Sequence, residues 1–243
     1  MAHNKSPQKR DKENSVNIID NTLEYYINLL KEGKKFSFTR WGDGEWLCLF
    51  GKQGHNIDCH TYFPEMSKEL NNVFTNYKGY FLATWPQDRP MMARTWNPIK
   101  EYLSSKGLNF DWVNATVWEE RAIKGTISPL INQLEKMNFI IVSEASKRDL
   151  PMKYVDFIEV PSTNCYLEKS RIKQEMLQMC AKYSNPVFGL SASMATNVIV
   201  DELYPTIGDE CWMIDFGSIW EPYLKPSPRR SRSYHVRYKT KEL

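Results

Sequence analysis

Two acidic side chains separated by a single residue are the strongest chemical feature of the sequence. Asp43 and Glu45 lie in the stretch Arg-Trp-Gly-Asp-Gly-Glu, which runs from Arg40 to Glu45. Gly42 and Gly44 bracket Asp43 and allow tight backbone geometry and the close approach of a ligand. In a turn the two carboxylates can converge on one ion, and Mg²⁺ or Mn²⁺ prefers such oxygen ligands together with substrate phosphates. The alternative is a hydrophilic turn in which Glu45 opens a helix.

Alternating apolar segments indicate the elements that position these residues. Strands are expected at 35–39, 80–84, 112–117, 139–143, 156–160, 186–190 and 211–215. Helices are expected at 15–32, 64–77, 90–105, 127–137, 167–183 and 191–204. This alternation predicts an α/β fold, a single Rossmann-like domain whose mostly parallel sheet has helices on both faces. Ligands bind such folds in the loops at the carboxyl ends of the strands, which include 40–45 and 118–121.

Charge divides the chain into three parts, which we expect to be a disordered leader (1–14), the folded domain (15–224) and a basic strap (225–243). The strap has seven basic residues and one acidic residue, whereas the whole chain has a formal charge of +3. The body is therefore acidic, which argues against a general nucleic-acid binder. The five cysteines include no Cys-x-x-Cys pair. Together with the absence of a long apolar run, this predicts a cytoplasmic protein without a membrane span.

Several enzyme classes are excluded by the motifs that the sequence lacks. It contains no Gly-x-Ser-x-Gly elbow, no P-loop and no Gly-x-Gly-x-x-Gly after a strand. These absences disfavour serine hydrolases, P-loop kinases and dinucleotide-dependent oxidoreductases.

The stretch from Arg40 to Glu45 resembles the Arg-x-Gly-Asp-Gly-Glu motif of GT-D-type glycosyltransferases, in which an Asp-x-Glu pair replaces the Asp-x-Asp metal motif of other nucleotide-sugar enzymes. Three further segments are similar to that family in the same order along the chain: 189–195 (Gly-Leu-Ser-Ala-Ser-Met-Ala), 214–218 (Ile-Asp-Phe-Gly-Ser) and 231–234 (Ser-Arg-Ser-Tyr). Gly is common in the family at position 192 or 193, and this chain has Ala and Ser there.

The resemblance implies a metal-dependent hexosyltransferase that uses a nucleotide-diphosphate sugar, with a UDP-sugar as the expected donor, and a glycan or glycoprotein acceptor. Asp43 and Glu45 would hold Mn²⁺ or Mg²⁺, which stabilises the leaving diphosphate. The implied nucleotide-sugar-binding residues are Arg40, Gly42, Gly44, Ser191, Ser193, Asp215, Ser218, Arg230, Arg232 and Tyr234. The rival is a non-catalytic nucleotide-sugar or nucleic-acid-binding protein on the same fold.

Each of these residues also has a purely structural interpretation. Arg40 binds the diphosphate or orients Asp43, or it forms an ordinary ion pair at a strand end. Ser191 and Ser193 present an anion site at a helix N-terminus, or they only cap that helix. Asp215, with Ser218, binds ribose, uracil or metal, or it is a buried carboxylate that caps local backbone groups. Arg230, Arg232 and Tyr234 form a lid over phosphates, or they belong to a solvated tail.

A base for the acceptor hydroxyl is required only if the reaction inverts the anomeric centre. Glu144 and Glu221 are the catalytic candidates, together with Glu119 and Glu120. A second group, the His/Asp/Cys/His set at 55, 58, 59 and 60, has zinc-ligand chemistry. No second ligand pair accompanies it, so we interpret 55–60 as a loop near the rim of the site.

Overall fold

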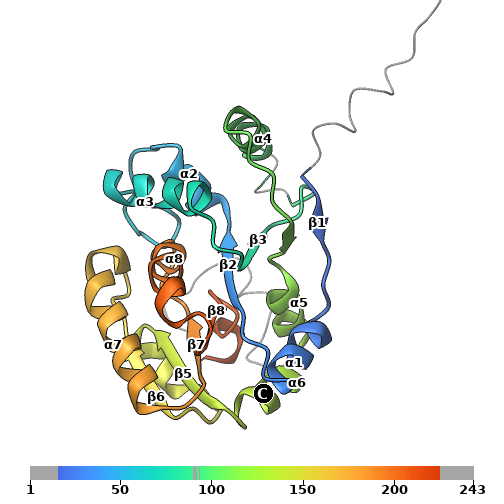
Figure 1. Cartoon of the computed structure of the whole chain (residues 1–243), viewed down its shortest axis with the longest axis vertical. Helices are drawn as coiled ribbons and strands as arrows, with labels where there is room; N and C mark the ends of the chain where they lie inside the picture. The colour runs from blue at the N-terminus through green and yellow to red at the C-terminus, as the bar shows by residue number, and fades with distance from the viewer. Residues whose placement is uncertain (1–15, 90–91, 93, 225–243) are drawn as a thin grey trace, which may run out of the picture.

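The computed structural model describes residues 16–89, 92 and 94–224 (Figure 1). These residues form one eight-stranded sheet in which every neighbouring pair of strands is parallel. Its order is β1-β4-β3-β2-β8-β7-β5-β6. The strands are β1 (Ile18–Ile19), β2 (Ser37–Trp41), β3 (Phe81–Thr84), β4 (Trp112–Asn114), β5 (Asn138–Ser143), β6 (Asp156–Glu159), β7 (Pro186–Leu190) and β8 (Trp212–Asp215). The predicted α/β fold with a parallel sheet is confirmed.

Helices cover both faces of the sheet (Figure 1). The helices α2 (Asp43–Leu49), α3 (Pro64–Thr75), α4 (Trp96–Ser105), α7 (Lys169–Lys182) and α8 (Ala195–Ile207) contribute to the apolar core on one face. The helices α1 (Leu23–Lys31), α5 (Val117–Lys124) and α6 (Ser128–Leu134) contribute to the core on the other. Short 3₁₀ segments, η1 (Ala145–Asp149), η2 (Cys165–Glu168) and η3 (Glu221–Tyr223), complete the connections.

Strand β5 shows how the sequence specifies a central strand. Ile140 and Val142 belong to the core beneath α7 and α8, whereas Phe139 and Ile141 belong to the core beneath α6. All four side chains are fully buried. Successive side chains of a strand point to opposite faces, so a strand covered on both sides is continuously apolar.

Several elements differ from the sequence-based expectation, and the strand expected at 112–117 ends at Asn114. The first helix begins at Leu23 after the Thr22 cap, because Ile18 pairs with Trp112 in an edge strand. The helix expected from residue 90 begins at Trp96, and the helix expected from 191 begins at Ala195. The expected loop 118–121 is part of α5.

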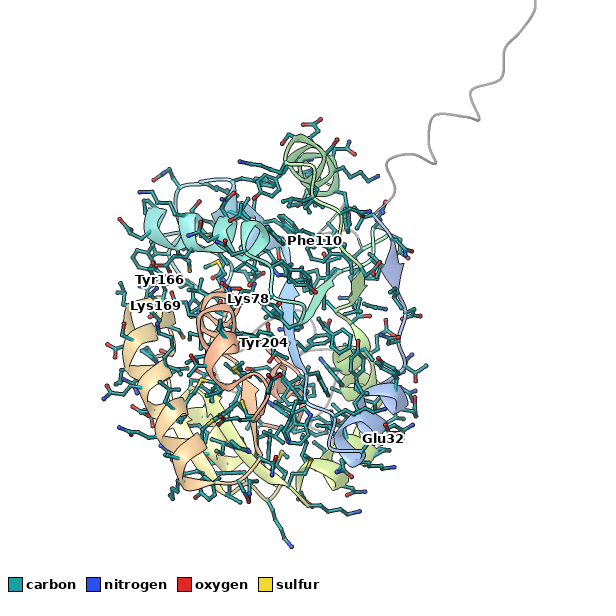
Figure 2. The ribbon with its side chains drawn as sticks, in the orientation of Figure 1. Glu32, Lys78, Phe110, Tyr166, Lys169 and Tyr204 are labelled. Atoms are coloured by element: carbon teal, nitrogen blue, oxygen red, sulfur yellow. The ribbon has the colours of Figure 1, made fainter. Side chains whose placement is uncertain are left out.

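Lys169 connects three helices on one face of the molecule. Its Nζ lies 2.7 Å from a Glu69 oxygen on α3 and 2.8 Å from a Glu202 oxygen on α8. Figure 2 shows Tyr166 and Lys169 side by side at one end of α7, where Nζ lies 5.3 Å from the centre of the Tyr166 ring. Among the described residues no helix combines the length and the apolar character needed to cross a bilayer.

Candidate functional site

Strands β2 and β8 are neighbours in the middle of the sheet, and the chain leaves them toward opposite faces. After β2 it enters α2, which packs on one core. After β8 it continues through Phe216 and Trp220, which pack on the other core. A divergence of this kind at the carboxyl ends of neighbouring strands is where α/β sheets bind ligands.

Arg40 and Asp215 form the centre of the site. Nε of Arg40 lies 3.2 Å from Oδ1 of Asp215, and the Arg40 N–H donates to Oδ2 at 3.3 Å. The guanidinium packs against Gly217, where an added Cβ would lie 1.4 Å from Nη2. Asn197 of α8 donates to the Arg40 carbonyl at 3.0 Å. Arg40 therefore forms the strand-end ion pair of the structural interpretation, and its partner is Asp215.

Acidic groups dominate the electrostatics around Arg40. Burial lowers the pKa of Arg40, but the carboxylates of Asp215, Glu119 and Glu45 outweigh it and raise that pKa overall. Burial raises the pKa of Asp215 by more than the Arg40 guanidinium lowers it. The guanidinium is thus permanently charged and lies among several carboxylates.

Asp43 and Glu45 occupy the first turn of α2. The Gly42 N–H donates to Oε2 of Glu45 at 2.9 Å, so Glu45 opens the helix as in the structural interpretation. Side chains two positions apart on a helix do not face each other. The Asp43 carboxylate makes no hydrogen bond or ion pair to any described residue. The described residues also contain no group of three or more His, Cys, Asp or Glu that could hold a metal ion. The first turn of α2 therefore presents one carboxylate, that of Asp43, without a partner among the described residues, beside a Glu45 carboxylate that caps the helix.

The shifted pKa of Glu45 makes the free energy of unfolding depend on pH. Burial raises the pKa of Glu45 to about 7. A carboxyl with a raised pKa in the folded state contributes stability below its unfolded pKa, and this contribution is lost as the pH rises through the folded pKa. Glu45→Gln keeps an acceptor for the Gly42 N–H but cannot ionise. We therefore expect its free energy of unfolding, measured relative to that of the wild type, to rise by roughly 2 kcal/mol as the pH goes from 5 to 8.

Urea unfolding in metal-free buffer at a series of pH values measures this difference. A difference between Glu45→Gln and wild type that does not change with pH would contradict the prediction.

The loops after β7 and β8 are bonded to each other. Ser191 donates from Oγ to the Gly217 carbonyl at 2.7 Å, and its N–H donates to Val142 at 2.9 Å. Because α8 begins at Ala195, Ser191 is neither its cap nor a free N–H donor, which corrects that expectation. Ser193 has a φ of 53°, in the left-handed region that favours glycine, and its Oγ accepts from Asn56 at 3.2 Å. Ser218 lies in the turn after β8, where its carbonyl accepts from the Glu221 N–H at 3.1 Å.

The two candidate bases Glu144 and Glu221 share one buried ammonium group. Nζ of Lys147 lies 2.7 Å from Oε1 of Glu144 and also pairs with Glu221. The Lys147 side chain is only 3% exposed. Sequence reasoning missed Lys147, because a Glu and a Lys three residues apart are common on exposed helical surfaces.

Arg89 and Trp85, which follow β3, also belong to the site. Arg89 donates from Nη1 to Oε2 of Glu119 at 3.2 Å, and its guanidinium carbon lies 5.4 Å from the centre of the Trp85 ring. Trp85 in turn packs beside Gly42, where an added Cβ would lie 3.6 Å from it. Glu120 instead accepts from Oγ1 of Thr116 at 2.9 Å.

Arg230, Arg232 and Tyr234 lie outside the described residues, as do the whole leader and the whole strap. No family model, no curated protein and no solved structure matches the chain.

Proposed function

We propose that the protein is a metal-dependent glycosyltransferase of the GT-D type that transfers a hexose from a UDP-sugar to a glycan or glycoprotein. One observation carries the proposal. Three of the segments that resemble the family, at 40–45, 189–195 and 214–218, meet at one end of adjacent strands. They are held together by the Arg40–Asp215 ion pair and by the Ser191–Gly217 hydrogen bond.

The charges of the site fit a nucleoside diphosphate with a divalent cation. Such a cation, when bound, would neutralise the charge that develops on the leaving diphosphate. Asp43 would hold it, and Glu45 in its ionised form would add a second carboxylate nearby. Arg40 supplies a fixed positive charge that needs no reorganisation during the reaction, because Asp215 and Gly217 hold its guanidinium in place.

Thermal unfolding with a panel of nucleotides and UDP-sugars, each with and without Mn²⁺, tests the proposal. A ligand at 100 times its dissociation constant adds about 2.7 kcal/mol to the folded state. We expect UDP or a UDP-sugar to raise the melting temperature of the wild type only when Mn²⁺ is present. Asp43→Asn should lose this increase, because its side chain no longer carries the charge that attracts the cation.

Asp209→Asn is the matched control, because Asp209 is an exposed carboxylate beyond the opposite, amino-terminal end of β8. It should respond to UDP and Mn²⁺ as the wild type does. No ligand-dependent increase in the wild type, or an unchanged increase in Asp43→Asn, would contradict the proposed function.

A further inference from the structure

Trp85 differs from the other tryptophans of the chain because it is partly exposed. The structure describes all eight tryptophans, and the other seven are buried, with Trp96 the most exposed of them at 4%. Trp85 directly follows β3 and packs against the cores on both faces of the sheet. Large apolar rings are mostly buried, so one that stays open at the carboxyl ends of the strands indicates a surface on which a ligand packs.

The indole of Trp85 borders the turn that carries Asp43. A Cβ on Gly42 would lie 3.6 Å from Cζ2 and 3.8 Å from Cε2 of this ring, so the ring packs on the backbone immediately before Asp43. The two segments meet because β2 and β3 are neighbours in the sheet, with Trp41 opposite Thr84. Trp85 therefore forms a wall of the turn that holds the candidate cation ligand.

A guanidinium and a carboxylate accompany the Trp85 ring. The guanidinium carbon of Arg89 lies 5.4 Å from the ring centre, and its Nη1 donates to Oε2 of Glu119 at 3.2 Å. Glu119 comes from the first turn of α5, which follows β4, the other neighbour of β3. The side chains of Arg89 and Glu119 are 26% and 23% exposed, so a ligand can reach both of them.

This set of side chains fits a hexose. The C–H groups of a pyranose ring form an apolar face that packs on an indole, and its hydroxyl groups both donate and accept hydrogen bonds. A guanidinium has only donors and an ionised carboxylate has only acceptors, so the Arg89–Glu119 pair offers both kinds of partner. Glu119 is also close enough to Arg40 for its charge to raise the pKa of that guanidinium, which connects the set to the centre of the site.

We propose that Trp85, Arg89 and Glu119 form the subsite for the hexose of the donor and determine which UDP-hexose the protein binds. The inference rests on the proposed function, in which Arg40 and a cation at Asp43 hold the diphosphate. The hexose is bonded directly to the diphosphate, whereas the ribose separates the uracil from it. A ring that packs within one residue of Asp43 therefore meets the hexose rather than the base.

Isothermal titration calorimetry of the full chain in Mn²⁺ tests this subsite with UDP, UDP-glucose, UDP-galactose and UDP-N-acetylglucosamine. Trp85→Leu keeps an apolar side chain but removes the flat ring, and Arg89→Met keeps the length but removes the donors. We expect each variant to bind the wild type's preferred UDP-hexose about 10- to 100-fold more weakly and to bind UDP within about twofold of the wild type. Retained UDP binding also shows that the variant is folded around the site.

Tyr25→Leu and Arg171→Met are the matched controls. Tyr25 is an exposed aromatic residue on α1, and Arg171 on α7 is another arginine paired with a glutamate, at 2.6 Å from Glu175. Both controls should bind every ligand as the wild type does. Unchanged UDP-hexose binding in Trp85→Leu or in Arg89→Met, or equal weakening of UDP and the UDP-hexose, would overturn the hexose subsite.

Saturation-transfer NMR gives a second measurement, with Mg²⁺ in place of the paramagnetic Mn²⁺. The hexose protons of the bound donor should receive saturation from the wild type, and Trp85→Leu should reduce it more at these protons than at those of the uracil. A larger reduction at the uracil protons would assign Trp85 to the base and overturn the inference. Failure of the wild type to bind UDP with Mn²⁺ would instead overturn the proposed function, and with it this inference.

Discussion

Asp215→Ala is expected to lower the free energy of unfolding by about 3–5 kcal/mol, because it leaves the Arg40 guanidinium buried without its counter-ion. The two side chains are only 16% and 8% exposed. Replacing both members of such a pair by apolar groups costs much less than removing one. Asp215→Ala should therefore cost markedly less in an Arg40→Met background. Urea unfolding of the four proteins measures both effects.

The matched control is Asp156→Ala. Asp156 pairs with Lys182 at 2.8 Å, but the Lys182 side chain is 56% exposed. Exposed pairs contribute about 0–1 kcal/mol, so this variant should unfold nearly as the wild type does. Equal losses for Asp215→Ala and Asp156→Ala would show that burial of the Arg40–Asp215 pair does not determine its contribution.

Lys147→Met should lower the free energy of unfolding by about 3 kcal/mol or more, because it removes a buried cation that two carboxylates share. The side chain of methionine has similar volume, so the loss reports charge rather than a cavity. Adding Glu221→Gln to Lys147→Met should recover part of the loss, since one of the two carboxylates is then neutral. Chemical denaturation at pH 7 is the measurement.

Arg148→Met provides the comparison for Lys147→Met. Arg148 is the next residue, and its ion pair with Glu159 joins side chains that are 49% and 53% exposed. We expect this variant to stay within about 1 kcal/mol of the wild type. The prediction for Lys147 is wrong if both variants lose the same amount, or if the added Glu221→Gln makes the loss larger.

Much of the fold could be predicted because its central strands are continuously apolar and its long helices are amphipathic. The errors fall where the pattern is short or where distant pairing decides the structure. Trp118 and Ala122 are the only buried residues of α5, and one pair with helical spacing is too little to distinguish a helix from a loop. Ile19 fits the helical spacing of the residues that follow it, but it lies in β1 opposite Val113, about ninety residues later.

The position of the candidate site in the fold could be predicted from the sequence, but the contacts between its side chains could not. A glycine-rich turn after a strand is a local feature, so the sequence indicated the place of Asp43 and Glu45. The partner of Arg40 depends on the order of strands in the sheet, which local spacing does not determine. The left-handed backbone conformation of Ser193, with a φ of 53°, is likewise not indicated by its residue type. Lys147 acquires its buried pair of carboxylates only through tertiary packing, so its type and spacing are ordinary.

The adjacency of β2 and β8 has a consequence for how the chain is made. Arg40 and Asp215 are 175 residues apart. At translation rates of 5–20 residues per second, the ribosome adds Asp215 about 10–35 seconds after Arg40. During this interval β2 lacks one neighbouring strand, and a nascent chain with an unpaired strand edge is prone to aggregation. Every fragment that stops before Trp212 would carry the complete 40–45 motif without the counter-ion that orders it, so we expect chaperones to hold such nascent chains until β8 emerges.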